Sequence, residues 1–107
     1  PGITALPPLP GPEFLALLAA AKLVITDSGG VQEEAWALDL PCLTLRPRTE
    51  RPLTLDLGTS RLLEPAGLDV AVAAALAGDW PRARPIPLWD GAAGLRMAAH
   101  LAELYPA

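Results

Sequence analysis

The 107-residue chain alternates short apolar runs with segments whose apolar residues recur at helical spacing. The runs Leu23–Thr26, Cys42–Leu45 and Arg61–Leu63 predict three short buried strands. A further apolar stretch predicts a fourth strand near Ile3–Leu6. Helical spacing of the apolar residues predicts helices over residues 12–21, 30–38, 68–76 and 91–105. It also predicts one helical turn over residues 53–58.

Helices that alternate with buried strands indicate a parallel sheet with helices on both faces. We therefore predict an α/β fold, a partial Rossmann-like three-layer domain with a short parallel sheet. The number of strands is small for a doubly wound domain, as though earlier strand–helix units were missing. Residues 79–90 are rich in proline and predict a long irregular connection before the last helix. That helix has an apolar face and a polar face, with Met97, Leu101 and Leu104 opposite Arg96, His100 and Glu103.

Composition narrows the function classes. The net charge is −4 and no basic run is present, so we expect no nucleic-acid partner. The single cysteine, Cys42, excludes an internal disulfide and lies in an apolar run, where a buried structural thiol is expected. The sequence shows no metal-binding cluster and requires no cofactor. No apolar segment reaches membrane-spanning length and no signal-peptide pattern is seen, so we expect a cytoplasmic protein without a membrane partner.

The stretch TDSGGVQEEA, residues 26–35, joins a predicted strand to a predicted helix. Free backbone N–H groups at such a helix start, together with the helix dipole, favour an anion. Gly29 and Gly30 allow close backbone approach and Ser28 adds a hydroxyl, so a phosphate or diphosphate would fit. The plainer interpretation is that Asp27 or Ser28 caps the helix and the glycines make the turn.

Two glutamates follow the glycines, and a helical wheel separates them. With about 100° per residue and Val31 set at zero, Val31, Ala35 and Leu38 form the buried stripe. Glu33 then points to water, whereas Glu34 flanks the buried face. A carboxylate in that position would suit the two hydroxyls of a ribose. Favourable interaction with the helix dipole explains either glutamate equally well.

Three segments together resemble the non-hydrolysing UDP-N-acetylglucosamine 2-epimerases. TDSGGVQEEA, RPRTERP and GTSRLL agree in order and spacing over Leu23–Leu63 with the patterns DSGG-(I/V)-QEEA, R-x-x-TERPE and G-T-x-x-L-V. The resemblance implies the C-terminal half of a GT-B architecture, in which two Rossmann-like domains face a cleft. It also implies interconversion of UDP-N-acetylglucosamine and UDP-N-acetylmannosamine, by elimination and re-addition of UDP.

The resemblance also implies binding residues. The diphosphate would be held by Ser28, Gly29 and Gly30, and the ribose by Glu34. The loop 46–52 would lie beside the cleft. It carries the remaining candidate substrate-binding residues, Arg46, Thr49, Glu50 and Arg51. Arg46, Arg48 and Arg51 also make this loop locally positive; the alternative interpretation is a solvated surface turn.

The family's catalytic histidine and carboxylates have no counterpart in this sequence. His100 lies on the polar face of the last helix, where a solvated side chain is expected. We therefore predict no catalytic residue and no epimerisation by this chain alone. Residues 1–107 would form a UDP-binding C-terminal domain fragment that lacks the N-terminal catalytic domain. Elsewhere the sequence departs from the family pattern at Trp36, Leu53, Ile86, Leu88 and Trp89.

Two other functions remain open. A related GT-B glycosyltransferase would need a different donor-site signature. A non-catalytic UDP-sugar-binding module, or a decayed remnant, would explain the missing catalytic residues. The expected partners are UDP or a UDP-N-acetylhexosamine, the missing N-terminal domain, and a second copy of the chain, because Trp36, Trp89 and the last helix offer apolar surface. Trp36 would otherwise pack on a neighbouring loop.

Overall fold

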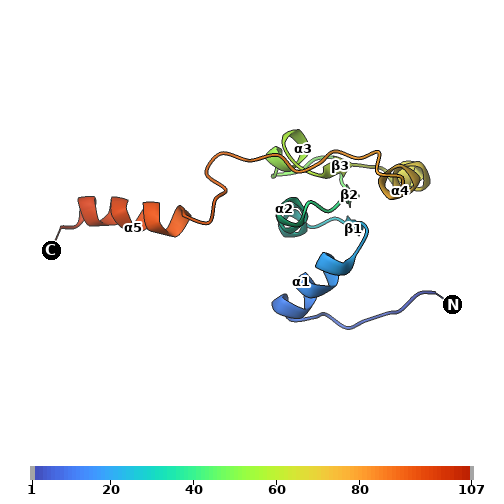
Figure 1. Ribbon diagram of the computed structural model, residues 1–107, viewed down its shortest axis with the longest axis horizontal. Coiled ribbons are helices and arrows are strands. Elements are labelled where there is room, and N and C mark those ends of the chain that lie inside the picture. Colours follow the sequence, from blue (N-terminus) through green and yellow to red (C-terminus); the bar gives the residue numbers. More distant parts are fainter. Residues whose placement is uncertain (1, 107) are drawn as a thin grey trace.

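The structure is a computed structural model and describes residues 2–106. Figure 1 shows a small layered body from which one helix extends. The elements in chain order are α1 (Gly11–Ala20), β1 (Val24–Thr26), α2 (Gly29–Leu38), β2 (Cys42–Thr44), α3 (Leu53–Asp56), β3 (Ser60–Leu62), the 3-10 turn η1 (Pro65–Gly67), α4 (Leu68–Leu76) and α5 (Ala93–Leu104). The predicted helices and the three main strands are thus confirmed, with ends shifted by one or two residues.

The predicted strand at Ile3–Leu6 is wrong. This segment has no regular structure, and Ile3 is 91% exposed. Pro7 and Pro8 follow directly and provide no backbone donors for a ladder. The apolar pattern was therefore present without a neighbouring strand to pair with.

The three strands form one parallel sheet in the order β1-β2-β3. Val24 pairs with Cys42, and Cys42 pairs with Ser60, so the carboxyl ends of all three strands meet at one edge. The helix α2 connects β1 to β2, and α3 lies between β2 and β3. The central strand β2 is buried along its whole length, as expected for a strand covered on both faces.

Helices cover both faces of the sheet, which confirms the three-layer prediction. On one face, Leu18 of α1 and Ala35 of α2 pack with Cys42. On the other, Ala71 and Ala75 of α4 pack with Leu43 and with Trp80 just after α4. Figure 1 shows α2 and α4 on opposite sides of the strands. Cys42 is a fully buried free thiol, as predicted.

The outer edge of β1 is open within the part of the chain that the structure describes. The Val24 N–H donates to Pro41 O, and Thr26 O accepts from the Leu45 N–H. The backbone groups of Val24 and Thr26 therefore face β2. Strand geometry then directs the backbone groups of Ile25 outward, and its side chain is 44% exposed. This open edge fits the prediction of a partial domain.

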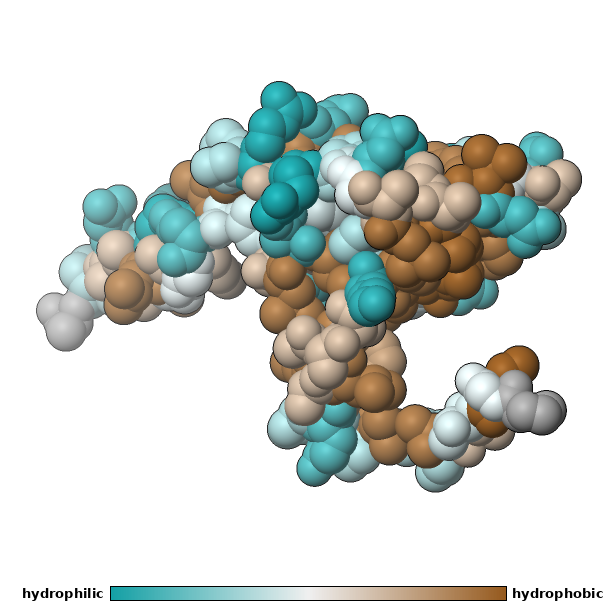
Figure 2. All heavy atoms as spheres, turned by 45° about the vertical axis from the view of Figure 1, so that its right-hand side comes forward, coloured by the Kyte–Doolittle hydropathy of each residue, from teal (hydrophilic) through white to brown (hydrophobic). Residues whose placement is uncertain are grey.

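Residues 79–90, called the strap, run from α4 past the ends of α3 and α2 to α5. Near its start, Trp80 is buried, and its indole Nε1–H donates to Thr59 O at 2.6 Å. Beyond the strap, α5 stands away from the other elements, and Met97 on its apolar face is 65% exposed. In Figure 2 apolar surface also continues from the body down onto α1. Among residues 2–106, no helix is long and apolar enough to cross a membrane.

Candidate functional site

The Ser-Gly-Gly turn lies where β1 ends and α2 begins. Ser28 has an extended backbone, with φ −92° and ψ 132°, and its Oγ accepts from the Val31 N–H at 3.4 Å. The Ser28 N–H in turn donates to Thr26 Oγ1 at 3.0 Å. Ser28 is therefore the N-cap of α2, as the plainer interpretation held. The amides of Gly29 and Gly30 open the helix, where N–H groups have no intrahelical acceptor, so they remain available to an anion.

The side chain of Arg51 lies over this helix start. A Cβ atom added to Gly29 would meet Arg51 Cγ at 3.7 Å and Arg51 Cζ at 3.6 Å. Arg51 Nε donates to Glu33 Oε1, which forms an ion pair between the loop 46–52 and α2. The Glu33 side chain is 44% exposed, on the solvent side as expected, but the helical wheel did not predict its pairing with Arg51. The loop residue and the first turn of the helix are joined, and a guanidinium stands beside the free amides.

Gln32 is a buried residue that the helical wheel missed. Its amide Nε2 donates to Thr44 Oγ1 at 3.2 Å, and its Oε1 accepts from Thr49 Oγ1 at 2.7 Å. Of the predicted stripe, Ala35 is fully buried, whereas Leu38 is 39% exposed. The sequence did hold a signal, because Gln32 precedes Ala35 by three residues and so lies on the same helix face.

The loop 46–52 is ordered by its own side chains. Arg46 donates to both carboxylate oxygens of Glu50, at 2.8 and 3.1 Å. This hydrogen bonding lowers the pKa of Glu50 and raises the pKa of Arg46. The Thr49 hydroxyl accepts from the Arg51 N–H at 3.0 Å. Arg46 is paired within the loop and Arg48 is exposed, so the guanidinium that this loop places at the helix start is that of Arg51, which is itself paired with Glu33 of α2.

Glu34 has a buried carboxylate oxygen that lacks a partner. Among the described residues, no donor reaches its Oε2. Glu34 thus flanks the buried face, as the wheel predicted, and is half-buried. Burial of an acceptor without a donor is unfavourable, typically by about 1–3 kcal/mol. A ligand hydroxyl that donated to Oε2 would remove this cost.

The opposite end of α2 is closed by the strap. Trp36 Nε1 donates to Arg84 O at 2.8 Å, which confirms that Trp36 packs on a neighbouring loop. Its ring meets Trp89 edge to face, with centroids 5.2 Å apart. Asp39, in a left-handed conformation at the helix end, accepts from the Ala83 N–H at 2.7 Å and pairs with Arg82. The hydrogen bonds from Arg82 and Ala83 lower the pKa of Asp39.

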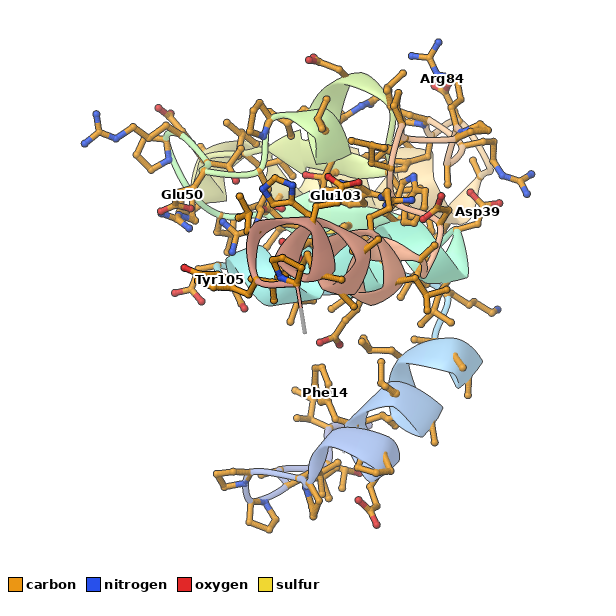
Figure 3. The ribbon with its side chains drawn as sticks, turned by 90° about the vertical axis from the view of Figure 1, so that its left-hand side faces the viewer. Phe14, Asp39, Glu50, Arg84, Glu103 and Tyr105 are labelled. Atoms are coloured by element: carbon orange, nitrogen blue, oxygen red, sulfur yellow. The ribbon has the colours of Figure 1, made fainter. Side chains whose placement is uncertain are left out.

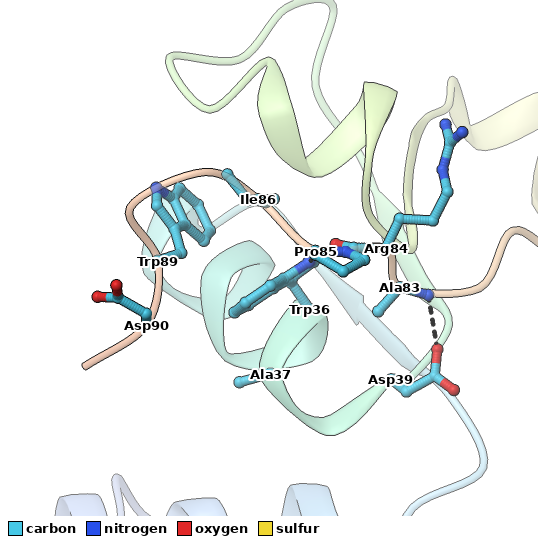
Figure 4. Close-up of a pocket in the computed structure, with 9 residues that line it drawn as sticks. All are labelled: Trp36, Ala37, Asp39, Ala83, Arg84, Pro85, Ile86, Trp89 and Asp90. Atoms are coloured by element: carbon cyan, nitrogen blue, oxygen red, sulfur yellow. Dashed lines mark hydrogen bonds between the residues drawn. The ribbon is translucent and has the colours of Figure 1, made fainter. Parts of the chain in front are cut away.

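A shallow pocket of about 580 Å³ lies between this end of α2 and the strap (Figure 4). Trp36, Trp89 and Ile86 form much of its lining. The Trp36 indole N–H and both carboxylate oxygens of Asp39 are already hydrogen-bonded to the strap. Figure 3 shows Glu50 and Asp39 at opposite ends of α2, so this pocket is separate from the predicted binding residues.

The structure brings four of the eight predicted binding residues to one place. Ser28, Gly29 and Gly30 form the start of α2, and Arg51 lies over them. Three loop residues hold each other or α2 rather than standing free: Arg46, Thr49 and Glu50. His100 is exposed on α5, as expected for a solvated side chain.

Comparison with known proteins identifies the family to which the chain is similar. A family model described as UDP-N-acetylglucosamine 2-epimerase matches residues 1–102. The UDP-N-acetylglucosamine 2-epimerases of Methanococcus maripaludis and Methanocaldococcus jannaschii are 60% identical over 50 residues and 57% identical over 51. These matches cover 47% and 48% of this chain, and 14% of each relative.

The same likeness extends to solved structures. The UDP-GlcNAc 2-epimerase of M. jannaschii in complex with UDP-GlcNAc and UDP matches with a TM-score of 0.78 and 39% identity. The match covers 92% of this chain and 27% of that structure, so the chain spans about a quarter of the solved relative. A second structure of this epimerase matches with a TM-score of 0.70. By its sequence and its fold, the chain belongs to the UDP-N-acetylglucosamine 2-epimerase family.

Proposed function

We propose that this chain is the UDP-binding part of a UDP-N-acetylglucosamine 2-epimerase. It would be the C-terminal half of a GT-B enzyme that interconverts UDP-N-acetylglucosamine and UDP-N-acetylmannosamine by elimination and re-addition of UDP. Membership of the family supports this proposal, as does the likeness to a relative solved with UDP-GlcNAc and UDP.

The observation that carries the proposal is the pairing of two unsatisfied features on α2. Gly29 and Gly30 offer backbone donors at the helix start, and Glu34 keeps a buried oxygen without a donor. Glu34 lies five positions after Gly29 on the helix, which is about 7.5 Å along the axis. A nucleoside diphosphate carries anionic phosphates next to a ribose with two hydroxyl donors. One ligand could therefore satisfy both features.

The loop 46–52 would complete the anion site. Arg51 places its guanidinium beside the Gly29 backbone, where it can interact with a phosphate through charge-assisted hydrogen bonds. Arg46 and Glu50 hold each other across the loop, and Thr49 links it to α2. We assign Arg51 a direct role in UDP binding. Arg46, Thr49 and Glu50 belong to the same binding loop.

Chemistry at the sugar would need groups from outside this chain. Elimination requires a base at C2 of the sugar and an acid or electrostatic help for the leaving UDP. Within residues 2–106, His100 lies on α5, which stands away from the start of α2. We therefore propose that the chain binds UDP and that other parts of a longer protein supply catalysis. The cytoplasmic location and the self-association expected from the sequence remain predictions.

Calorimetric titration of UDP into the intact protein that contains this chain tests the proposal. We expect saturable binding that weakens by about tenfold or more in Glu34→Ala, since a buried polar contact is lost. Binding that is absent, or that is unchanged in this variant, would contradict the proposed site. Asp39→Ala is a matched control, because Asp39 is a carboxylate at the far end of the same helix and should leave UDP affinity unchanged.

A non-catalytic UDP-sugar-binding module is the second candidate. It is favoured by the position of His100 on α5, away from the Ser-Gly-Gly turn. Incubation of the intact protein with UDP-N-acetylglucosamine separates the two functions. Appearance of UDP-N-acetylmannosamine supports the epimerase, whereas UDP binding without conversion supports the module.

A further inference from the structure

We propose that Gln32 is the positioning residue for Arg51. It would hold the loop 46–52 so that the guanidinium stands over Gly29, where a diphosphate meets the guanidinium and the backbone amides together. This inference rests on the proposed function, because it concerns the geometry of the same anion site. It adds a residue that need not touch the ligand.

The first step is that Gln32 uses both ends of its amide inside the protein. Its side chain is fully buried, with 0% exposure. Nε2 donates to Thr44 on the central strand, and Oε1 accepts from Thr49 in the loop. The residue thus joins the sheet, the helix and the loop. Because Gln32 is uncharged, its removal changes the affinity for an anion through position rather than through charge.

The second step is that the loop backbone at Arg51 is held from two sides. Thr49 Oγ1, itself bonded to Gln32, accepts from the Arg51 N–H at 3.0 Å. The Thr54 hydroxyl donates to Arg51 O at 2.7 Å. A Cβ added to Gly58 would lie 2.9 Å from Thr54 Cα, so a glycine lets α3 come this close. The contact at the Arg51 N–H thus depends on Gln32 through Thr49, whereas the contact at Arg51 O comes from α3.

The third step concerns the side chain of Arg51. It forms an ion pair with Glu33, in which the Arg51 side chain is 39% exposed and the Glu33 side chain is 44% exposed. Pairs of this kind contribute about 0–1 kcal/mol, which is too little to fix a mobile loop by itself. Buried polar networks, in contrast, fix geometry strongly when every member is satisfied. Glu33 thus orients a guanidinium whose backbone Gln32 has already placed.

The test is a double-mutant cycle on UDP affinity in the intact protein. Gln32→Met keeps the side-chain length and removes both hydrogen bonds. We expect it to weaken UDP binding by about tenfold, within the range that coupled neighbours show. In the Arg51→Ala background, the same change should cause no further loss, because Gln32 acts through Arg51. Equal losses in both backgrounds would overturn the inference and leave Gln32 as a structural residue.

A second readout does not depend on the ligand. The Arg51 Nε–H donates to Glu33, so this proton, observed through its attached ¹⁵N by NMR, should exchange with water more slowly than in a guanidinium without an acceptor. Gln32→Met should speed this exchange and leave the strap signals, such as the Trp36 indole N–H, unchanged. If Gln32→Met does not fold, Thr49→Val removes the Thr49–Gln32 hydrogen bond from the loop side. It should show the same non-additivity with Arg51→Ala in UDP affinity. An unaltered Arg51 signal in the folded variant would overturn the inference.

The outcomes separate this inference from the proposed function. Absence of UDP binding in the unmodified protein would overturn the proposed function, and the inference with it. UDP binding with additive losses at Gln32 and Arg51 would overturn the inference alone. UDP binding with a non-additive cycle would support both.

Discussion

The two ends of α2 are built for different purposes. At the start of the helix, the Gly29 and Gly30 amides remain available, and Glu34 in the next turn keeps an oxygen without a partner. At the far end, Asp39 and Trp36 are bonded to the strap. Figures 3 and 4 show this closed end from two directions.

We therefore expect residues at the far end of α2 to contribute to stability and residues at its start to contribute to ligand binding. Side chains at the far end satisfy each other, so changing them should lower the free energy of unfolding without altering a distant ligand site. Groups at the start are incompletely satisfied, which natural proteins tolerate where a ligand will complete them. Variants at the start should therefore affect UDP affinity more than stability.

The largest effect on stability is expected for Trp36→Ala at the closed end. The variant loses the contact with Trp89 and the hydrogen bond to the strap. Because large aromatic-to-alanine changes in cores cost about 3–5 kcal/mol and Trp36 is half-buried, we expect a loss of about 3 kcal/mol. Urea unfolding measures this loss. UDP affinity of the folded variant should be unchanged, and a large fall in affinity would break the separation of the two ends.

Glu34→Leu should have the opposite pattern. Removing a buried oxygen without a donor should raise the free energy of unfolding by about 1 kcal/mol. UDP affinity should fall by about tenfold or more, because the ribose hydroxyls lose their acceptor. Thermal unfolding and calorimetry on the same sample check both parts. A variant that is less stable yet binds UDP normally would contradict the role given to Glu34.

Two buried threonines, Thr44 on the central strand and Thr59 just before β3, give a finer comparison. Thr44 accepts from Gln32, so Thr44→Val leaves a buried donor unsatisfied and should cost about 1–2 kcal/mol. Among the described residues, the buried Thr59 Oγ1 has no partner, so Thr59→Val removes an unsatisfied hydroxyl and should leave the free energy of unfolding unchanged or raise it by up to about 1 kcal/mol. Equal costs in urea unfolding would show that the Gln32 network does not stabilise the fold.

The smallest effect is a pH dependence at the closed end. The pKa of Asp39 is lowered in the folded state by hydrogen bonds from Arg82 and Ala83. Its stabilising contribution is therefore present above about pH 4, the usual range of a carboxyl group, and is lost as pH falls below it. Asp39→Asn should lower the melting temperature at pH 7 and reduce its change between about pH 4 and 2. An identical acid dependence in both proteins would contradict this assignment.

The sequence predicted the framework well because the framework depends on local patterns. Apolar runs placed the three strands, and the Ser-Gly-Gly turn placed the start of α2. Ile3–Leu6 showed the limit of this approach, since an apolar run becomes a strand only where a partner strand is available. That partner cannot be read from the run itself.

The site was predicted in part, for a similar reason. Helical periodicity placed Glu34 beside the buried face, and the structure agrees. Helical periodicity could not show that Glu33 would pair with Arg51, which lies eighteen residues later in the sequence. Burial of Gln32 likewise depends on Thr44 and Thr49, which approach it only after the chain folds. Contacts across the fold therefore set the polar network.

Amide-resolved NMR of the ¹⁵N-labelled intact protein during a UDP titration tests the central claim most directly. The account predicts shifts concentrated at Ser28–Glu34 and at Arg51, with the strap signals of Trp36 and Ala83 unmoved. Glu34→Ala should reduce these shifts at the same UDP concentration. Shifts centred on the strap, or none at saturating UDP in a folded protein, would contradict the claim that the start of α2 binds the nucleotide.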